Sequence, residues 1–116
     1  MAGRKLEHLN EVIRQKLGTI LIKEAHDPRF KLVTITGVGL AKDLSFARVQ
    51  FSCLDQSLEI EALTESLNRA AGFFSHTLAR TLSTRKTPRL QFYYDHGFDY
   101  AQNVDRLLAG IKKQEE

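Results

Sequence analysis

Arg69-Ala70-Ala71-Gly72 is the stretch that decides the fold of this 116-residue chain. An apolar stripe of helical period runs up to this stretch, and the same period resumes after it. A glycine within a helix costs about 1 kcal/mol relative to alanine, and its backbone adopts a break more easily than that of other residues. The pattern therefore predicts two helices that meet at a kink.

The sign of the charge changes at the same place. Residues 55–68 carry four acids and no base, whereas the segment from Arg69 to Leu90 has five basic residues and no acid. The five are Arg69, Arg80, Arg85, Lys86 and Arg89. This separation favours a polyanion as the partner, although the same side chains could form only a solvated surface.

Periodicity on both sides of the kink predicts the other elements. They are a helix from about Arg4 to Ala25, strands starting at Leu32 and Ser45, a helix capped by Ser57 before the kink, a third strand after Thr87-Pro88, and a last helix from Asp99. Three strands cannot bury themselves without helices packed across one face. We therefore expect one α+β domain over residues 1–116, with 112–116 as a short flexible tail.

Alternation along the strands predicts which side chains stay outside the core. The side chains expected on the open face of the sheet are Arg48, Gln50, Ser52, Arg89 and Gln91. Cys53 alternates with Val49 and Phe51 and is expected to be a small buried side chain.

The chain lacks the patterns that usually accompany catalysis or metal binding. A lone cysteine excludes an internal disulfide and a cysteine-rich zinc site. The four histidines have no ligand spacing, and no phosphate-binding loop, dinucleotide turn or serine elbow occurs. No apolar run approaches the length of a membrane span. We therefore expect a cytoplasmic binding protein with no catalytic residue, metal or cofactor.

Five short motifs follow one another along nearly the whole chain. They are Asp27-Pro28-Arg29, Val33-Thr34-Ile35-Thr36, Asp43-Leu44, Arg69-Ala70-Ala71-Gly72 and Pro88-x-Leu90-x-Phe92. In their order and spacing the chain resembles the ribosome-binding factor A family of bacterial assembly factors for the small ribosomal subunit. Two departures are the start of the last helix, Asp99 to Asn103, and a nearly absent carboxyl-terminal extension.

The resemblance implies a type II K-homology topology, α-β-β-α-kink-α-β-α, in which an Ala-x-Gly kink at Ala70-Ala71-Gly72 replaces the usual Gly-x-x-Gly loop. It also implies a monomer that binds free small (30S) subunits, contacts 16S rRNA around its 5′-terminal helix and touches neighbouring ribosomal proteins. The implied role is late subunit maturation and rRNA processing, including growth in the cold.

The kink is the predicted RNA-binding site, because exposed amides at a helix start and flanking guanidinium groups both favour phosphate. The predicted site residues are Arg69, Ala70, Ala71, Gly72, Arg80, Arg85, Lys86 and Arg89. The alternative for Gly72 is a packing glycine between close helices. Among aromatic residues that could stack on bases, Phe74 is expected in the core, Phe73 is ambiguous, and Tyr93 is the better exposed candidate.

Two other functions remain open from the residues alone. One is a small RNA-processing enzyme that uses His76 of the basic segment. The other is an adaptor that binds only proteins, through its basic face.

Overall fold

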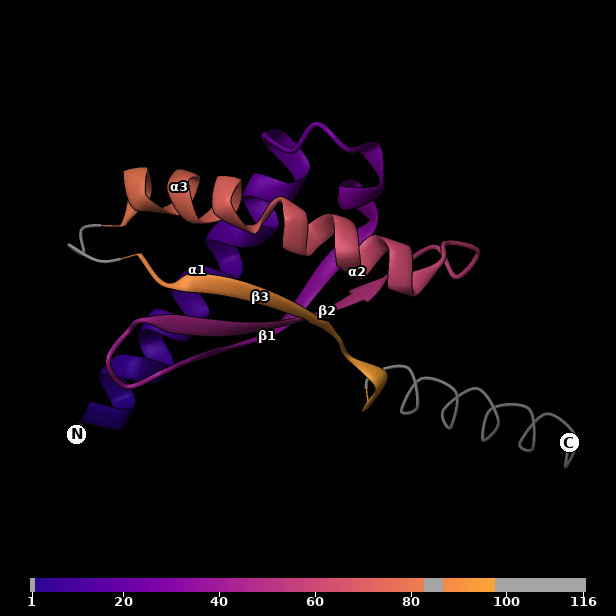
Figure 1. The fold of residues 1–116 in the computed structure, drawn as a ribbon. Helices are drawn as coiled ribbons and strands as arrows, with labels where there is room; N and C mark the ends of the chain where they lie inside the picture. Colours follow the sequence, from indigo (N-terminus) through magenta and orange to yellow (C-terminus); the bar gives the residue numbers. More distant parts are fainter. Residues whose placement is uncertain (1, 83–86, 98–116) are drawn as a thin grey trace, which may run out of the picture.

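The computed structural model describes residues 2–82 and 87–97. Its elements are helix α1 (Ala2–Lys23), the 3-10 helix η1 (Pro28–Leu32), strands β1 (Val33–Leu40) and β2 (Phe46–Cys53), helices α2 (Ile60–Arg69) and α3 (Ala71–Thr81), and strand β3 (Arg89–Tyr94). The α+β class and the predicted order are confirmed as far as β3 (Figure 1). The helix predicted from Asp99 lies outside the described residues.

In the described part of the chain, three strands form one sheet in the order β1-β2-β3. Strands β1 and β2 are an antiparallel hairpin with an irregularity between Ile35 and Gly37. Strand β3 is parallel to β2, so the chain must cross over the sheet between them. Helices α2 and α3 are that crossover, and they lie end to end along β3 (Figure 1).

The core lies between the sheet and the helices. It joins alternate residues of the strands, such as Val49, Phe51 and Phe92, to the inner stripes of the helices. Leu17 of α1, Leu67 of α2 and Phe74 of α3 are fully buried. The apolar stripe that predicted one helix on each side of a kink is thus the surface of α2 and α3 that packs on the sheet.

Most of the predicted open face is confirmed, since Arg48, Gln50, Arg89 and Gln91 are exposed. The prediction for Ser52 is wrong, because its side chain is buried. The alternation ends there, where Phe51, Ser52 and Cys53 are consecutive buried residues. Cys53 is buried, as predicted.

One further local prediction is wrong, and one short element is not predicted. Ser57 does not cap α2, because its hydroxyl donates to the Asp55 carboxylate at 2.6 Å. Helix α2 starts later, with Glu59 at the N-cap and no side-chain cap bond. After α1 ends at Lys23, the chain forms η1, which periodicity does not predict. No helix among the described residues is long and apolar enough to cross a membrane.

Candidate nucleic-acid interface

The break between α2 and α3 is a single residue, Ala70. Its φ of −88° and ψ of 1° lie in the bridge region between helix and strand. The Ala70 N–H donates to the Ser66 carbonyl and the Ala70 carbonyl accepts from the Phe74 N–H, both at 3.1 Å. These two bonds join Ala70 to α2 on one side and to α3 on the other. We call residues 69–72 the elbow.

Gly72 does not make the break. It lies in the first turn of α3, and no described glycine has a positive φ. A Cβ built on Gly72 would meet no heavy atom within 4 Å, and the residue is exposed. The alternative of a packing glycine is therefore wrong, and what the missing side chain leaves is open surface over the start of α3.

The start of α3 has the features of an anion site. The first N–H groups of an α-helix have no intrahelical partner and carry the positive end of the helix dipole. Ala70 supplies no side-chain cap, and the first turn of α3 contains no acid. Its amides are therefore not neutralised from within this turn, and small side chains leave room for a phosphate.

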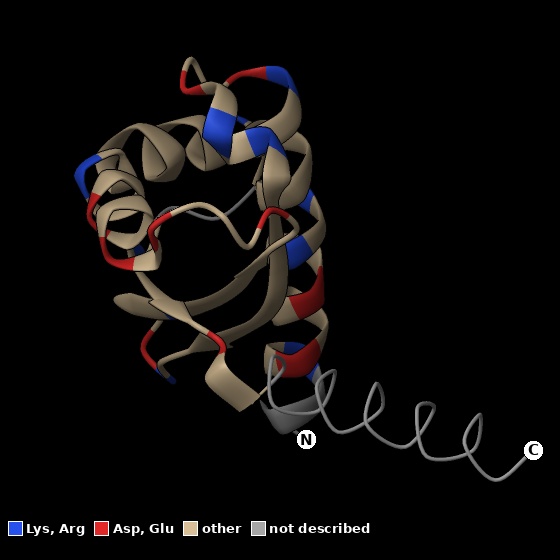
Figure 2. Ribbon diagram, turned by 90° about the vertical axis from the view of Figure 1, so that its right-hand side faces the viewer, with Lys and Arg blue, Asp and Glu red and all other residues tan. Residues whose placement is uncertain are grey.

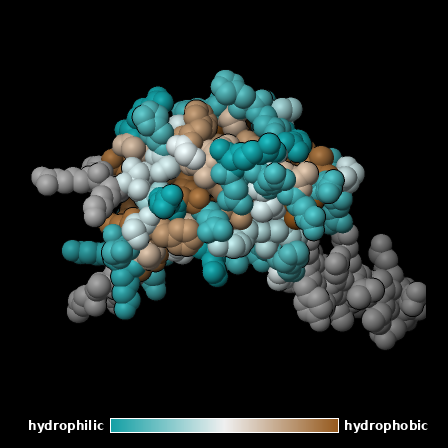
Figure 3. Space-filling view, viewed as in Figure 1, coloured by the Kyte–Doolittle hydropathy of each residue, from teal (hydrophilic) through white to brown (hydrophobic). Residues whose placement is uncertain are grey.

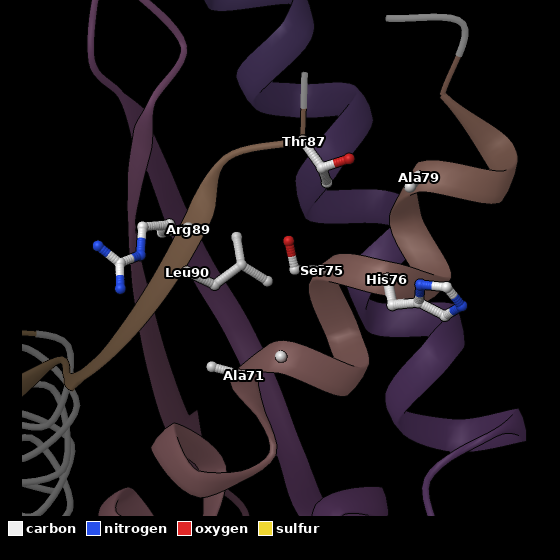
Figure 4. A pocket seen from close by; sticks show the side chains of 8 residues that line it. Ala71, Ser75, His76, Ala79, Thr87, Arg89 and Leu90 are labelled. Atoms are coloured by element: carbon white, nitrogen blue, oxygen red, sulfur yellow. The ribbon is translucent and has the colours of Figure 1, made fainter. Parts of the chain in front are cut away.

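A cavity of about 540 Å³ opens on one flank of the elbow, between α3 and β3. It is lined by Ala71, Gly72, Ser75, His76 and Ala79 of α3 and by Thr87, Arg89 and Leu90 (Figure 4). The Ser75 hydroxyl donates to the Pro88 carbonyl at 2.9 Å and fixes this end of β3 against the helix. Figure 4 shows the Arg89 side chain pointing away from Ser75, across the strand.

A second cavity, of about 590 Å³, opens on the other flank. We call it the elbow groove. Its lining residues come from the segment after α1 and from α2 and α3: Ala25, His26, Asp27, Arg29, Phe30, Ser66, Arg69, Ala70, Phe73 and Phe74. Figure 3 shows apolar surface in patches among polar residues on the side of the molecule that carries α2, α3 and β3.

Asp27 and Arg29 build one wall of the elbow groove. The Asp27 carboxylate accepts from the backbone N–H of Arg29 at 3.0 Å and from its guanidinium Nη2 at 2.6 Å. The same Nη2 donates to the Ser66 hydroxyl at 2.8 Å, which ties this segment to α2. The guanidinium bonds lower the pKa of Asp27 and raise the pKa of Arg29.

The structure distributes the predicted basic residues over the molecule. Arg69 lies at the elbow, Arg80 lies near the far end of α3, and Arg89 begins β3; all three are exposed. None of the three takes part in the ion pairs found among the described residues. Figure 2 likewise shows Lys and Arg dispersed over several elements. Arg85 and Lys86 lie outside the described residues.

The aromatic residues differ from prediction in one respect. Phe74 is fully buried, as expected, but Phe73 is 39% exposed. Tyr93 is half-buried, and the Arg48 guanidinium carbon lies 4.9 Å from the centre of its ring. The expectation that Tyr93 is the better exposed aromatic is therefore wrong, and Phe73 takes its place.

Groups that could hold a metal ion do not occur in the part of the chain that the structure describes. All four histidines are exposed: His8 lies on α1 and His76 on α3, whereas His26 lies between α1 and η1 and His96 follows β3. His76 lines the cavity between α3 and β3 and belongs to neither ion pair of the described residues. The described residues therefore form binding surfaces around the elbow. Within residues 2–82 and 87–97, His76 has no carboxylate beside it in this cavity with which it could act as a catalytic pair.

Comparison with known proteins gives one consistent result. Residues 5–108 match the family model described as ribosome-binding factor A. A relative of that name from Dichelobacter nodosus is 39% identical over 113 residues, which cover 97% of this chain and 93% of the relative.

Solved structures agree with the sequence match. The crystal structure of ribosome-binding factor A from Thermus thermophilus is 31% identical and has a TM-score of 0.67 over 77% of this chain and 94% of that one. A homology model of the Thermus thermophilus factor, fitted into a cryo-EM map of its 30S complex, is 32% identical, with a TM-score of 0.62 over 75% and 91% of the chains.

Proposed function

This chain belongs to the ribosome-binding factor A family, and from that premise we propose that it binds the free 30S ribosomal subunit by gripping 16S rRNA at the elbow. Support for the partner is the Thermus thermophilus relative, whose fitted model belongs to a 30S complex. Support for the surface is the geometry of the α2–α3 junction.

The observation that carries the proposal is the bare first turn of α3. Its amides have no side-chain cap, no acid neutralises them within the turn, and Gly72 leaves the approach open. A phosphate oxygen seated there accepts hydrogen bonds from the backbone and interacts favourably with the helix dipole. The elbow thereby replaces the nucleotide-clamping loop of other K-homology domains.

Basic residues on both sides extend the contact along the RNA backbone. Arg69 precedes the bare turn, and Arg80 lies about 14 Å along α3 from Ala71, by the helical rise of 1.5 Å per residue. Arg85, Lys86 and Arg89 continue the basic segment in sequence. Glu61 and Glu65 on the exposed side of α2 repel phosphate and so restrict how the RNA can lie.

The finer role follows the family. The protein supports late 30S maturation and rRNA processing near the 5′-terminal helix of 16S rRNA, in the cytoplasm and with particular importance in the cold. It acts as a monomeric K-homology-like domain over residues 1–116 and contacts neighbouring ribosomal proteins. Phosphate contacts position RNA without reading its sequence, so the folded rRNA and those proteins supply specificity.

A noncatalytic role fits the surfaces better than the two alternatives. An RNA-processing enzyme would need a partner for His76, and the described lining of the adjacent cavity contains no carboxylate. An adaptor that binds only proteins would not need the uncapped turn. Alanine at position 76 should leave subunit maturation intact, whereas complete loss would favour the enzyme.

Chemical footprinting of 16S rRNA on isolated 30S subunits tests the proposal. The protein should protect backbone positions around the 5′-terminal helix, and Arg69→Glu should remove part of that protection. Full protection by the variant would exclude the elbow as the contact. An rRNA pattern unchanged by the wild-type protein would contradict the proposed function itself.

A further inference from the structure

The elbow groove contains an exposed aromatic ring, Phe73, which phosphate binding alone does not require. We infer that it holds one unstacked base of the bound RNA, with the base on the Phe73 ring. This inference rests on the proposed function and deepens it, because it adds a base-binding subsite beside the phosphate site at the start of α3. It concerns the flank of the elbow opposite the cavity between α3 and β3.

Phe73 is the natural platform for a base. Its side chain is 39% exposed although it is large and apolar, and it faces a cavity rather than flat surface. The His26 ring lies 6.5 Å from it, centroid to centroid, at an interplanar angle of 41°. The rings are therefore inclined rather than stacked on each other, and both residues are exposed.

The platform is held in position before any ligand arrives. Phe73 meets the buried Phe74 edge to face, with 5.7 Å between centroids. Phe74 in turn packs on Phe30 of η1 at 5.8 Å and on Phe92 of β3 at 5.6 Å. This continuous aromatic contact ties the exposed ring to the core, so little side-chain freedom is lost when a base stacks on it.

The charges that line the groove fit a nucleotide. Asp27 is neutralised by Arg29, which leaves Arg69 as the uncompensated cation among the residues described in the groove lining. The Arg29 guanidinium bonds to Asp27 and Ser66 through Nε and Nη2, so among the described residues Nη1 has no hydrogen-bond partner. A guanidinium donor beside an aromatic face suits the acceptor edge of a base, and Arg69 suits its phosphate.

The volume also suits this occupant. A cavity of about 590 Å³ falls within the usual range for small-molecule sites, roughly 300–1,000 Å³. It is bounded by Ala70, the residue of the break, so a chain whose phosphate sits on the first turn of α3 has a base beside the groove. An aromatic side chain of a ribosomal protein is the rival occupant.

Two ten-nucleotide probes separate base from backbone. One is oligoadenylate, and the other is a ribose–phosphate chain of the same length with abasic residues throughout. Stacking on a protein aromatic is worth about 5- to 150-fold in affinity per base. In fluorescence anisotropy the 116-residue protein should prefer oligoadenylate by a factor in that range.

Phe73→Leu should reduce the preference to less than about twofold and leave the affinity for the abasic chain unchanged. Leu54→Ala is the matched control, since Leu54 is an exposed apolar residue at 74% exposure outside the groove. It should bind both probes like the wild type. His26→Ala should lower the preference partially.

Three results would overturn the inference. They are no preference for oligoadenylate in the wild-type protein, an unchanged preference in Phe73→Leu, and an equal loss of affinity for both probes in Phe73→Leu, which would show that Phe73 has only a structural role. The affinity of Phe73→Leu for 30S subunits tests the rival occupant, an aromatic side chain of a ribosomal protein. Weaker subunit binding with unchanged oligonucleotide binding would assign the groove to a protein side chain. If Phe73→Leu and His26→Ala have no effect while Arg69→Glu weakens subunit binding, the inference fails and the proposed function stands.

Discussion

The side-chain amide of Asn68 forms two hydrogen bonds with the backbone of Phe92. The Phe92 N–H donates to Oδ1 at 2.8 Å, and Nδ2 donates to the Phe92 carbonyl at 3.2 Å. The Arg89 N–H donates to the Ser45 carbonyl and the Asp95 N–H donates to the Phe51 carbonyl, so both groups face the neighbouring strand β2. Because the direction of the backbone groups alternates along a strand, the N–H and carbonyl of Phe92 face away from β2. Asn68 thus pairs with the outer edge of β3 and fixes α2 beside it, one residue before the elbow.

Asn68→Ala should destabilise the fold by about 1–3 kcal/mol, because it leaves a donor and an acceptor of β3 without partners. Urea denaturation followed by circular dichroism measures the change in the free energy of unfolding. Gln56→Ala, at an exposed loop position, is the control and should change it by less than about 0.5 kcal/mol. A loss at Asn68 no larger than the control would show that the two bonds do not stabilise α2 against the sheet.

Gly72→Ala separates folding from binding. Because the added methyl meets no neighbour, the variant should be as stable as the wild type or more stable by up to about 1 kcal/mol. If a phosphate approaches the first turn of α3, the same methyl should weaken 30S binding. Gly39→Ala, another exposed glycine with open space around it, is the control and should bind normally.

Because Gly72 lies within α3 and not at the break, a larger side chain at position 72 should not affect the kink. If glycine made the kink, a valine would remove it, but the break is made by Ala70, so valine should leave the kink in place and act on RNA binding. Thermal melting together with sedimentation of 30S complexes distinguishes these effects. A large loss of stability in Gly72→Ala would contradict the account of the elbow.

The Asp27–Arg29 pair predicts a pH dependence with a definite sign. Because the folded protein lowers the pKa of Asp27, the carboxylate contributes stability above its unfolded pKa of about 3.9. This contribution is lost as the pH falls through the lower folded value. The melting temperature of Asp27→Asn should therefore lie below that of the wild type at pH 7, and the two should converge at acid pH.

Glu24→Gln is the control for that series, since Glu24 is exposed and outside the ion pairs of the described chain. Its melting temperature should follow the wild type at every pH. A difference for Asp27→Asn that stays constant from pH 7 to pH 3 would show that its cause is not the ionised carboxylate.

Much of the fold could be predicted because local patterns and packing agree. The stripe of α1 and the alternation in β3 are both local signals, and the core uses both. The cap predicted at Ser57 does not form, because the Asp55 carboxylate two residues earlier binds the Ser57 hydroxyl. The sequence pattern indicates the kink correctly but attributes it to glycine, whereas an alanine adopts the bridge conformation.

The candidate site was predictable only in part. The elbow is contiguous in sequence, so its residues stand together in the pattern. The elbow groove joins residues 25–30 to residues 66–74, and such long-range proximity has no periodic signal. Two local signs pointed to it: the Asp27-Pro28-Arg29 motif and a second phenylalanine beside the buried Phe74. How Arg85 and Lys86 contribute stays a prediction.

The central claim is that the elbow and its cationic flanks grip 16S rRNA. The most direct measurement compares the affinity of two charge-reversed variants for isolated 30S subunits at two salt concentrations. One is Arg69→Glu with Arg80→Glu; the control is Lys5→Glu with Lys42→Glu, which changes the net charge equally at exposed positions in α1 and the β1–β2 turn. Circular dichroism should show both folded.

The elbow variant should lose more than about tenfold in affinity at about 0.1 M salt and have a shallower salt dependence, because fewer counterions are released. The control should lose much less. Equal affinities of the two variants, or an unchanged salt dependence in the elbow variant, would contradict the claim.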